Sequence, residues 1–193
     1  MTIDPGKFKN KYRIASARLK GWDYTTAGYY FITICTRERI AYFGAVINGE
    51  MRLSTLGEFA DKYWRGIPDH FPHVTLDEFV IMPNHVHGII VINSNDFSAV
   101  ETRDDCVETQ HAASLRIKST HPASLHMQPG SVSMIVRSYK SAVRRWAGLN
   151  NHNNFAWQER FYDHIIRNEK SLENIRMYIL ANPGGWDTDE YYA

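Results

Sequence analysis

The chain has 193 residues, of which 44% are hydrophobic, and a formal net charge of +1, which predicts one soluble domain of ordinary size. No apolar run approaches the roughly 20 residues of a membrane span, and the basic N-terminus lacks a signal-peptide core. Two cysteines exclude a disulfide framework and a cysteine-rich zinc module. We therefore expect a cytoplasmic protein with no membrane partner.

The small net charge conceals an uneven distribution along the chain. Basic residues dominate in residues 1–40 and 131–182, whereas acidic residues dominate in residues 41–130 and in the C-terminal tail. Two basic segments can build one positive face for a polyanion such as a nucleic acid. Two separate solvated surfaces explain the same distribution equally well.

The first half of the chain predicts strands, a hairpin and one helix. Asn48 and Gly49 suit the two-residue turn of a hairpin. Thr55 and Glu58 have the spacing of a capping box, and Pro68 is expected to end the helix that follows. In chain order, the expected strand, hairpin, helix and two further strands cover residues 29–36, 45–53, 56–67, 74–82 and 85–92.

The second half begins with residues 93–130, which are polar and show no sustained period, so that we expect a flexible insertion. Apolar residues at helical spacing predict a helix over 131–147. A strand with its approach is expected over 155–166, and Asn168 is expected to cap a last helix over 169–181.

Without the hairpin and the insertion, the order is strand, helix, strand, strand, helix, strand and one extra helix. This order predicts an α+β, ferredoxin-like split β-α-β sandwich with an antiparallel sheet and two helices on one face. The other face is left for a site. We divide the chain into a basic arm (1–27), one domain (28–186, including the insertion) and an acidic tail (187–193).

The most informative pattern is a pair of histidines separated by one residue at the start of an apolar strand. Residues i and i+2 of a strand point to the same face, so that His85 and His87 can converge on one metal ion. Two half-exposed histidines without a function are the alternative interpretation of this pattern alone.

The last predicted helix carries a second candidate group. Tyr178 and Asn182 are one turn apart and share a helix face. A tyrosine with a pKa near 10 becomes a workable nucleophile for a phosphodiester when a divalent ion stabilises the developing charge. Taken alone, Tyr178 is one of 11 tyrosines.

Three blocks of the sequence resemble one family. His85-Val86-His87 after Met82-Pro83-Asn84 is similar to the HUH motif of the single-tyrosine transposases of small insertion sequences. Together with residues 157–167 and 178–183, it resembles the branch called REP-associated tyrosine transposases. The resemblance covers residues 29–186 and implies a ferredoxin-like fold.

The resemblance also implies metal-dependent cleavage and rejoining of single-stranded DNA next to hairpins or inverted repeats, in a bacterial protein. By position, Tyr178 would be the nucleophile, forming a 5′-phosphotyrosine, and His85 and His87 would hold Mg²⁺ or Mn²⁺. Asn182 falls where insertion-sequence relatives place a glutamine, and it is the candidate third ligand, although it is one methylene shorter. Relatives act as dimers or as monomers, so that a homodimer stays open.

Basic side chains are the candidate DNA contacts. The alternative is that these basic side chains form an ordinary solvated surface. Separately, we expect the Tyr191-Tyr192 pair to belong to a frayed tail. The candidates are Arg137, Lys140, Arg144 and Arg145 on the helix over 131–147, and Lys7, Lys9, Lys11 and Arg13 in the arm.

Three other functions compete with the transposase. The first is a non-cleaving DNA-hairpin-binding protein derived from a transposase. The second is a metal-dependent hydrolase that uses activated water and leaves no covalent adduct. The third is an α/β domain whose histidines have no function. The complete set of His85, His87 and Tyr178 favours the enzyme.

Overall fold

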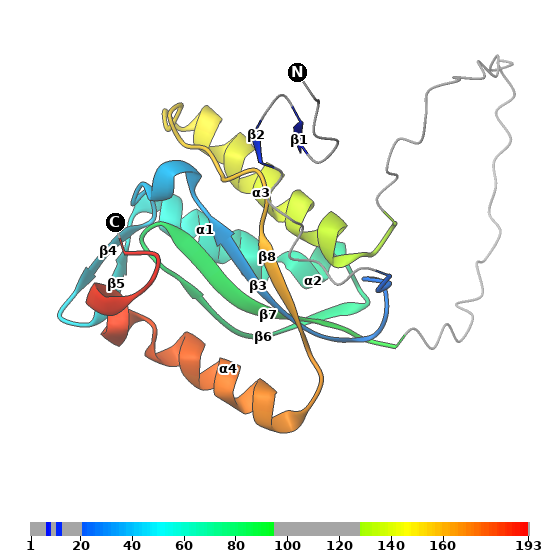
Figure 1. Cartoon of the computed structure of the whole chain (residues 1–193). Coiled ribbons are helices and arrows are strands. Elements are labelled where there is room, and N and C mark those ends of the chain that lie inside the picture. Colours follow the sequence, from blue (N-terminus) through cyan, green and yellow to red (C-terminus); the bar gives the residue numbers. More distant parts are fainter. Residues whose placement is uncertain (1–6, 9–10, 13–20, 95–127, 193) are drawn as a thin grey trace, which may run out of the picture.

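The computed structural model describes residues 7–8, 11–12, 21–94 and 128–192. Four antiparallel strands form its main sheet in the order β6-β7-β3-β8, as Figure 1 shows. Helix α1 follows β3 and helix α3 precedes β8, which confirms the predicted ferredoxin-like order. The strands are β3 (Gly28–Cys35), β6 (Val74–Ile81), β7 (His85–Ile92) and β8 (Tyr162–Ile166), and these helices are α1 (Thr55–Arg65) and α3 (Val132–Leu149).

Helices cover the two faces of this sheet unequally. Alternate residues of β7 point to opposite faces, so that Val86 and Ile90 join the main core, whereas Ile89 joins a second, smaller core. Helices α1 and α3 pack on the main core. Helix α4 (Glu169–Ala181) lies on the other side, where its Leu172 and Ile179 complete the smaller core (Figure 1).

The smaller elements lie around the sheet. The predicted hairpin forms between β4 (Gly44–Ile47) and β5 (Glu50–Leu53), and Asn48 and Gly49 both have the positive φ that such a turn requires. The remaining elements are the paired strands β1 (Lys7–Phe8) and β2 (Lys11–Tyr12), helix α2 (Ile67–His70), and the 3₁₀ turns η1 (Arg37–Arg39) and η2 (Pro183–Thr188).

Two local predictions about the first helix are wrong. Ser54, not Thr55, caps α1, because its hydroxyl accepts a hydrogen bond from the Gly57 N–H. Pro68 does not end the helix but lies in the first turn of α2, where a proline loses no hydrogen bond. The cap of α4 at Asn168 is confirmed. Most of the predicted insertion, residues 95–127, lies outside the described residues.

None of the helices in the described residues is long and apolar enough to cross a membrane.

Gly88 lets α1 pack directly on the strand that carries the histidines. It lies beside Ile32 of β3 and Phe79 of β6, on the main-core face of β7. A Cβ atom at this position would collide with the Trp64 ring and would lie 2.9 Å from the Cβ of Phe79. The buried Trp64 therefore occupies the space that a side chain at residue 88 would need.

We expect Gly88→Ala to lower the free energy of unfolding by about 2 kcal/mol, because the tightly packed Trp64 cannot move away without strain. Urea denaturation monitored by tryptophan fluorescence measures the change. Gly148→Ala, near the end of α3, is the control. Apart from the adjacent residues and the backbone of the helix itself, no described atom lies within 4 Å of the added methyl group there, and alanine favours the helix, so that stability should be unchanged or higher. Equal stability of the Gly88→Ala variant and the wild type would refute this packing.

Candidate active site

The two histidines lie side by side on the face of β7 that α4 covers. His85 pairs with Cys35 and His87 with Thr33 of β3, and both rings are buried. The ring centroids are 4.4 Å apart. His85 and His87 therefore lie together on one face of the strand, as the sequence predicts.

A hydrogen bond to Nδ1 holds each ring. The Asn84 side chain donates its Nδ2 protons to two backbone carbonyls, those of Arg39 and Tyr191, so that its Oδ1 is the acceptor facing His85 Nδ1 at 2.8 Å. His85 consequently carries its proton on Nδ1 and leaves a lone pair on Nε2. The Nδ1 of His87 lies 2.9 Å from the Thr33 hydroxyl.

Both imidazoles are neutral at physiological pH. Burial lowers the pKa of His85 to about 3, aided by the positive charge of Arg39 and opposed by the Asn182 side chain. Burial also lowers the pKa of His87 to about 3, aided by His85 and opposed by the Asp189 carboxylate. Neutral imidazole is the form that binds a metal ion.

Tyr178 reaches this pair from α4. Its hydroxyl lies 3.1 Å from His87 Nε2, and its ring contacts that of Phe31 edge-on at 6.2 Å. The side chain is 41% exposed, so that the hydroxyl is held at one end while the ring borders solvent. Burial and the nearby Asp189 and Glu190 carboxylates raise the pKa of Tyr178 to about 12, which keeps the phenol protonated.

An ion pair fixes α4 to the sheet two residues before Tyr178. Arg176 Nε and Nη2 donate to the two oxygens of Asp77 at 2.9 and 2.7 Å. Asp77 belongs to β6, at an irregularity of its pairing with β7. The fork of two parallel hydrogen bonds fixes the orientation of the helix as well as its position.

We expect Asp77→Asn to lower the free energy of unfolding by about 1 kcal/mol at pH 7, because the pair is only partly shielded from water. Arg176 lowers the pKa of Asp77 in the folded protein, so that the stabilisation is present above the unfolded value near 3.9 and is lost as the pH falls through the folded pKa. Urea denaturation at pH 7 and pH 3 measures this.

The exposed pair of Glu50 and Arg52 provides the control for this prediction. Its hydrogen bond is equally short, at 2.8 Å, but both side chains are mostly in water, so that Glu50→Gln should leave stability unchanged. A difference between wild type and Asp77→Asn that persists undiminished at pH 3 would contradict the ionic origin of the stabilisation.

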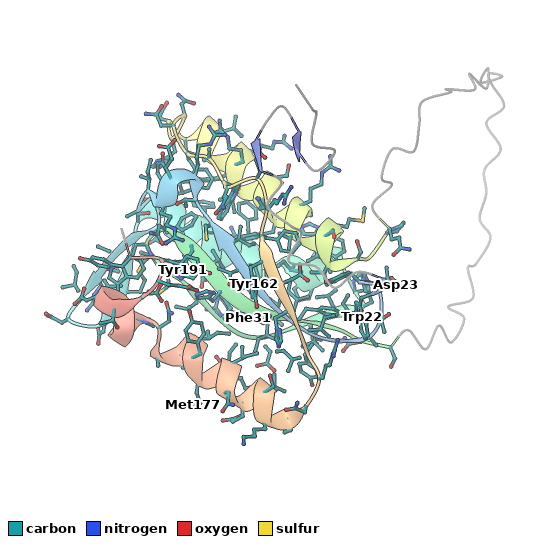
Figure 2. The ribbon with its side chains drawn as sticks, in the orientation of Figure 1. Trp22, Asp23, Phe31, Tyr162, Met177 and Tyr191 are labelled. Atoms are coloured by element: carbon teal, nitrogen blue, oxygen red, sulfur yellow. The ribbon has the colours of Figure 1, made fainter. Side chains whose placement is uncertain are left out.

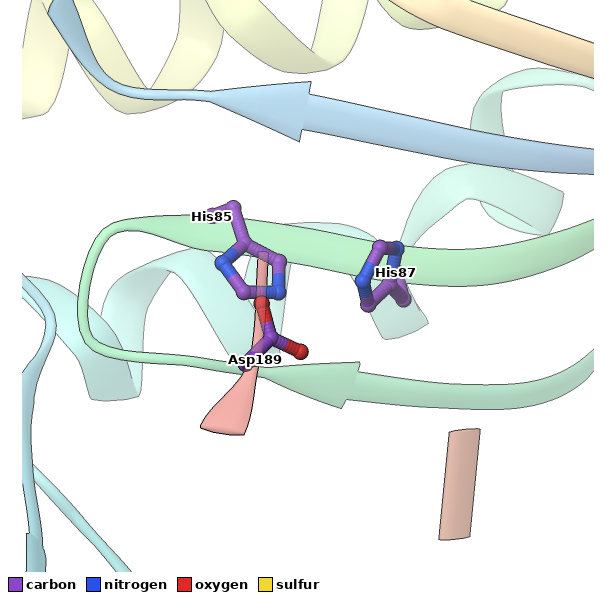
Figure 3. Close-up of side chains that lie close together, drawn as sticks. All are labelled: His85, His87 and Asp189. Carbon is purple, nitrogen blue, oxygen red and sulfur yellow. The ribbon is translucent and has the colours of Figure 1, made fainter. Parts of the chain in front are cut away.

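Two oxygen-bearing side chains complete the cluster. Asn182 Nδ2 donates to Asp189 Oδ2 at 2.8 Å, so that the buried Asn182 presents its Oδ1 to the site. One ligand atom each from His85, His87 and Asp189 lie within 4.8 Å of one another. Figure 3 shows the histidines on β7 and the Asp189 carboxylate approaching them from the end of the chain that follows α4.

Residues 183–192, here called the C-terminal segment, pack against the histidines. The ring of Tyr191 lies 4.6 Å from that of His85 and 5.5 Å from that of His87. Arg39 holds this segment, because its guanidinium lies over the Tyr191 ring and donates to the Glu190 carbonyl. Arg39 itself has a left-handed backbone, with φ 55°, a conformation that side chains other than glycine seldom adopt.

The prediction of a frayed tail is therefore wrong for Tyr191, and the sequence reasoning missed Asp189. The residue type alone made Asp189 a possible metal ligand, because carboxylates bind divalent ions. A polar, aperiodic stretch such as residues 187–193 gave no indication of where that carboxylate would lie.

The predicted DNA contacts on α3 do not converge on the histidines. Arg137, Arg144 and Arg145 are exposed on α3, in the layer on the other side of the sheet. Lys140 Nζ donates to the Gln158 carbonyl at 2.6 Å. The side chains of Lys7, Lys9, Lys11 and Arg13 lie outside the described residues.

The donor set fits a divalent cation. The buried His85 Nε2 and Asn182 Oδ1 have no hydrogen-bond partner among the described residues. Two such buried atoms, one nitrogen and one oxygen, would each gain a partner from an ion bound between them. His85, His87, Asp189 and Asn182 are accordingly the side chains that could hold a metal ion.

Comparisons with known proteins bear on this arrangement. No family model matches the chain. The chain is 40% identical over 178 residues to an uncharacterized protein of Haemophilus influenzae, over 92% of each chain. It is 28% identical over 162 residues to a second protein of this organism, named "Putative REP-associated tyrosine transposase", over 83% of this chain and 73% of that protein.

A solved structure shares the fold. A REP-associated tyrosine transposase bound to a REP hairpin matches with a TM-score of 0.55 at 20% identity, over 86% of this chain and 73% of that chain. The antiparallel four-stranded sheet and its helices are thus common to both proteins.

Proposed function

We propose that the chain is a REP-associated tyrosine transposase, which cleaves and rejoins single-stranded DNA next to hairpins through a 5′-phosphotyrosine intermediate; its similarity to one such protein in sequence and to another in fold supports this. One observation carries the proposal. The Tyr178 hydroxyl lies 3.1 Å from His87 Nε2, at the edge of the group of side chains that could hold a metal ion.

The proposed step is a transesterification at phosphorus. The Tyr178 oxygen bonds to the scissile phosphorus as the bond from phosphorus to the 3′ oxygen breaks. The phenol loses its proton, and the departing 3′ oxygen gains one, which leaves a free 3′-hydroxyl. Attack by the 3′-hydroxyl of another strand reverses the step and restores a phosphodiester without an external energy source.

The chain's own side chains have defined roles in this proposal. The hydrogen bond between the Tyr178 hydroxyl and His87 Nε2 places the attacking oxygen beside this group of side chains, and an ion bound to His87 would replace that hydrogen bond, because Nε2 has a single lone pair. His85, His87, Asp189 and Asn182 would hold Mg²⁺ or Mn²⁺. When bound, the ion supplies Lewis-acid stabilisation of the charge that develops on the phosphate oxygens. The bond between Arg176 and Asp77 keeps α4 in place during attack.

Hairpin DNA is the proposed partner because the solved relative is bound to a REP hairpin. The exposed arginines of α3 are proposed to contact phosphates of the stem, although they lie in the layer away from the histidines.

The experiment uses hairpin oligonucleotides with single-stranded flanks, taken from inverted repeats that flank the gene and labelled at either end. With Mn²⁺, the 3′-labelled fragment should migrate with the denatured protein, whereas the 5′-labelled fragment should be released with a 3′-hydroxyl. Release of both fragments would indicate a hydrolase. Binding without cleavage would indicate a non-cleaving hairpin-binding protein. Either result would refute the proposal.

A further inference from the structure

Two pockets of different character both border Tyr178. One, of about 480 Å³, is lined by the rings of Phe31, Tyr162, Tyr178 and Tyr191 and also by Thr33, His87 and Glu190. The other, of about 360 Å³, lies between the end of α4 and the C-terminal segment and is lined by Asn182, Thr188 and Asp189 among others. The scissile phosphate of a DNA strand links two nucleotides. If this phosphate lies at Tyr178, the two pockets provide different surroundings for the two nucleotides.

The aromatic pocket opens along the edge strand of the sheet. Tyr162 of β8 pairs with Thr33 of β3 and therefore faces the same side as Phe31, whose ring it contacts edge-on at 6.4 Å. Figure 2 shows Phe31, Tyr162 and Tyr191 gathered on the side of the sheet that faces α4. Tyr162 is 46% exposed, so that a large part of its ring is available for contact.

The chemistry of the walls selects the base of a nucleotide rather than its phosphate. The Glu190 carboxylate borders the pocket and repels an anion, but it accepts hydrogen bonds from the amino group of a base. Aromatic rings bind bases of any sequence by stacking. A partly exposed tyrosine beside such walls is the kind of platform that single-strand-binding proteins use.

We infer that this pocket binds the unpaired base next to the scissile phosphate and that Tyr162 is the residue on which this base stacks. The inference rests on the proposed function, because it places the phosphate at Tyr178. It makes Tyr162 a positioning residue for the substrate, outside the group of side chains that could hold the metal ion.

The test measures stacking without cleavage. Hairpin oligonucleotides carry 2-aminopurine at one unpaired position at a time and are bound to the Tyr178→Phe protein. Stacking should quench the fluorescence at one position, and adding Tyr162→Ala should abolish this quenching, whereas adding Tyr162→Phe should preserve it. Tyr29→Ala is the matched control, since Tyr29 is 37% exposed on the same face of β3 but does not line the pocket.

Affinity provides a second readout. Tyr162→Ala should weaken binding of the unpaired strand roughly 5- to 150-fold, and an abasic site at the quenched position should weaken wild-type binding equally. Combining both changes should cause no further loss, because each removes the same contact. Additive losses, or quenching that survives Tyr162→Ala, would overturn the inference.

The outcomes separate the inference from the proposed function. Covalent adducts without any effect of Tyr162→Ala would refute the base pocket and leave the cleavage mechanism intact. Quenching that depends on Tyr162, in a protein that never forms an adduct, would refute cleavage and leave the base pocket intact.

Discussion

Tyr178→Phe is expected to abolish the covalent adduct and to reduce cleavage of a hairpin substrate by roughly three orders of magnitude or more. The change removes the attacking oxygen and its hydrogen bond to His87 but keeps the ring that contacts Phe31. Folding and hairpin affinity should therefore be preserved. Circular dichroism, electrophoretic mobility shift and denaturing gels measure the three properties separately.

Tyr191→Phe is the sharpest comparison for this prediction. The Tyr191 ring lies against both histidines, whereas the Tyr178 ring contacts that of His87, so that Tyr191 is the rival nucleophile. The Tyr191→Phe protein should still form the adduct, because it is the Tyr178 hydroxyl that is hydrogen-bonded to a nitrogen of the histidine pair. If the adduct still forms in Tyr178→Phe but not in Tyr191→Phe, then Tyr191 and not Tyr178 is the nucleophile.

The second large effect is expected at the histidines. His85→Gln and His87→Gln should each reduce cleavage by roughly two orders of magnitude or more, because each removes one imidazole nitrogen from the proposed metal ligands. Calorimetric titration with Mn²⁺ should detect one site in the wild type and greatly weakened binding in both variants. A chelator should reproduce the loss of cleavage in the wild type.

His70→Gln is the control for the histidine variants, because His70 is exposed at the end of α2 and away from the cluster. It should leave both cleavage and Mn²⁺ binding unchanged. Hairpin affinity of His85→Gln and His87→Gln should stay near that of the wild type, which separates a catalytic defect from a folding defect. Full cleavage by either variant, or cleavage that a chelator does not affect, would contradict a role for the ion.

The sequence predicted the parts of the site that depend on periodicity. The two-residue spacing of His85 and His87 indicated one face of a strand, and the four-residue spacing of Tyr178 and Asn182 indicated one face of a helix. The order of the elements then predicted the antiparallel sheet that carries β7, with a face left for a site, but it did not predict that α4 packs on that face. Such spacing can be interpreted from the sequence because, within one helix or strand, it determines which side chains point to the same face.

The remaining parts of the site depend on contacts between segments that are distant in the sequence. The C-terminal segment lies at the histidines because Asn84 donates to the Tyr191 carbonyl and Arg39 contacts Tyr191 and Glu190. None of these contacts produces a periodic pattern of residues in the sequence. The left-handed backbone of Arg39 could not be predicted either, because arginine has no strong preference for turns.

Mass-spectrometric mapping of the trapped adduct tests the central claim most directly. No lysine or arginine follows Arg176, so that trypsin releases residues 177–193 as one peptide containing Tyr178, Tyr191 and Tyr192. Fragmentation of this peptide should place a 5′-linked nucleotide on Tyr178. A nucleotide on either of the other two tyrosines, or on any other peptide, would contradict the account.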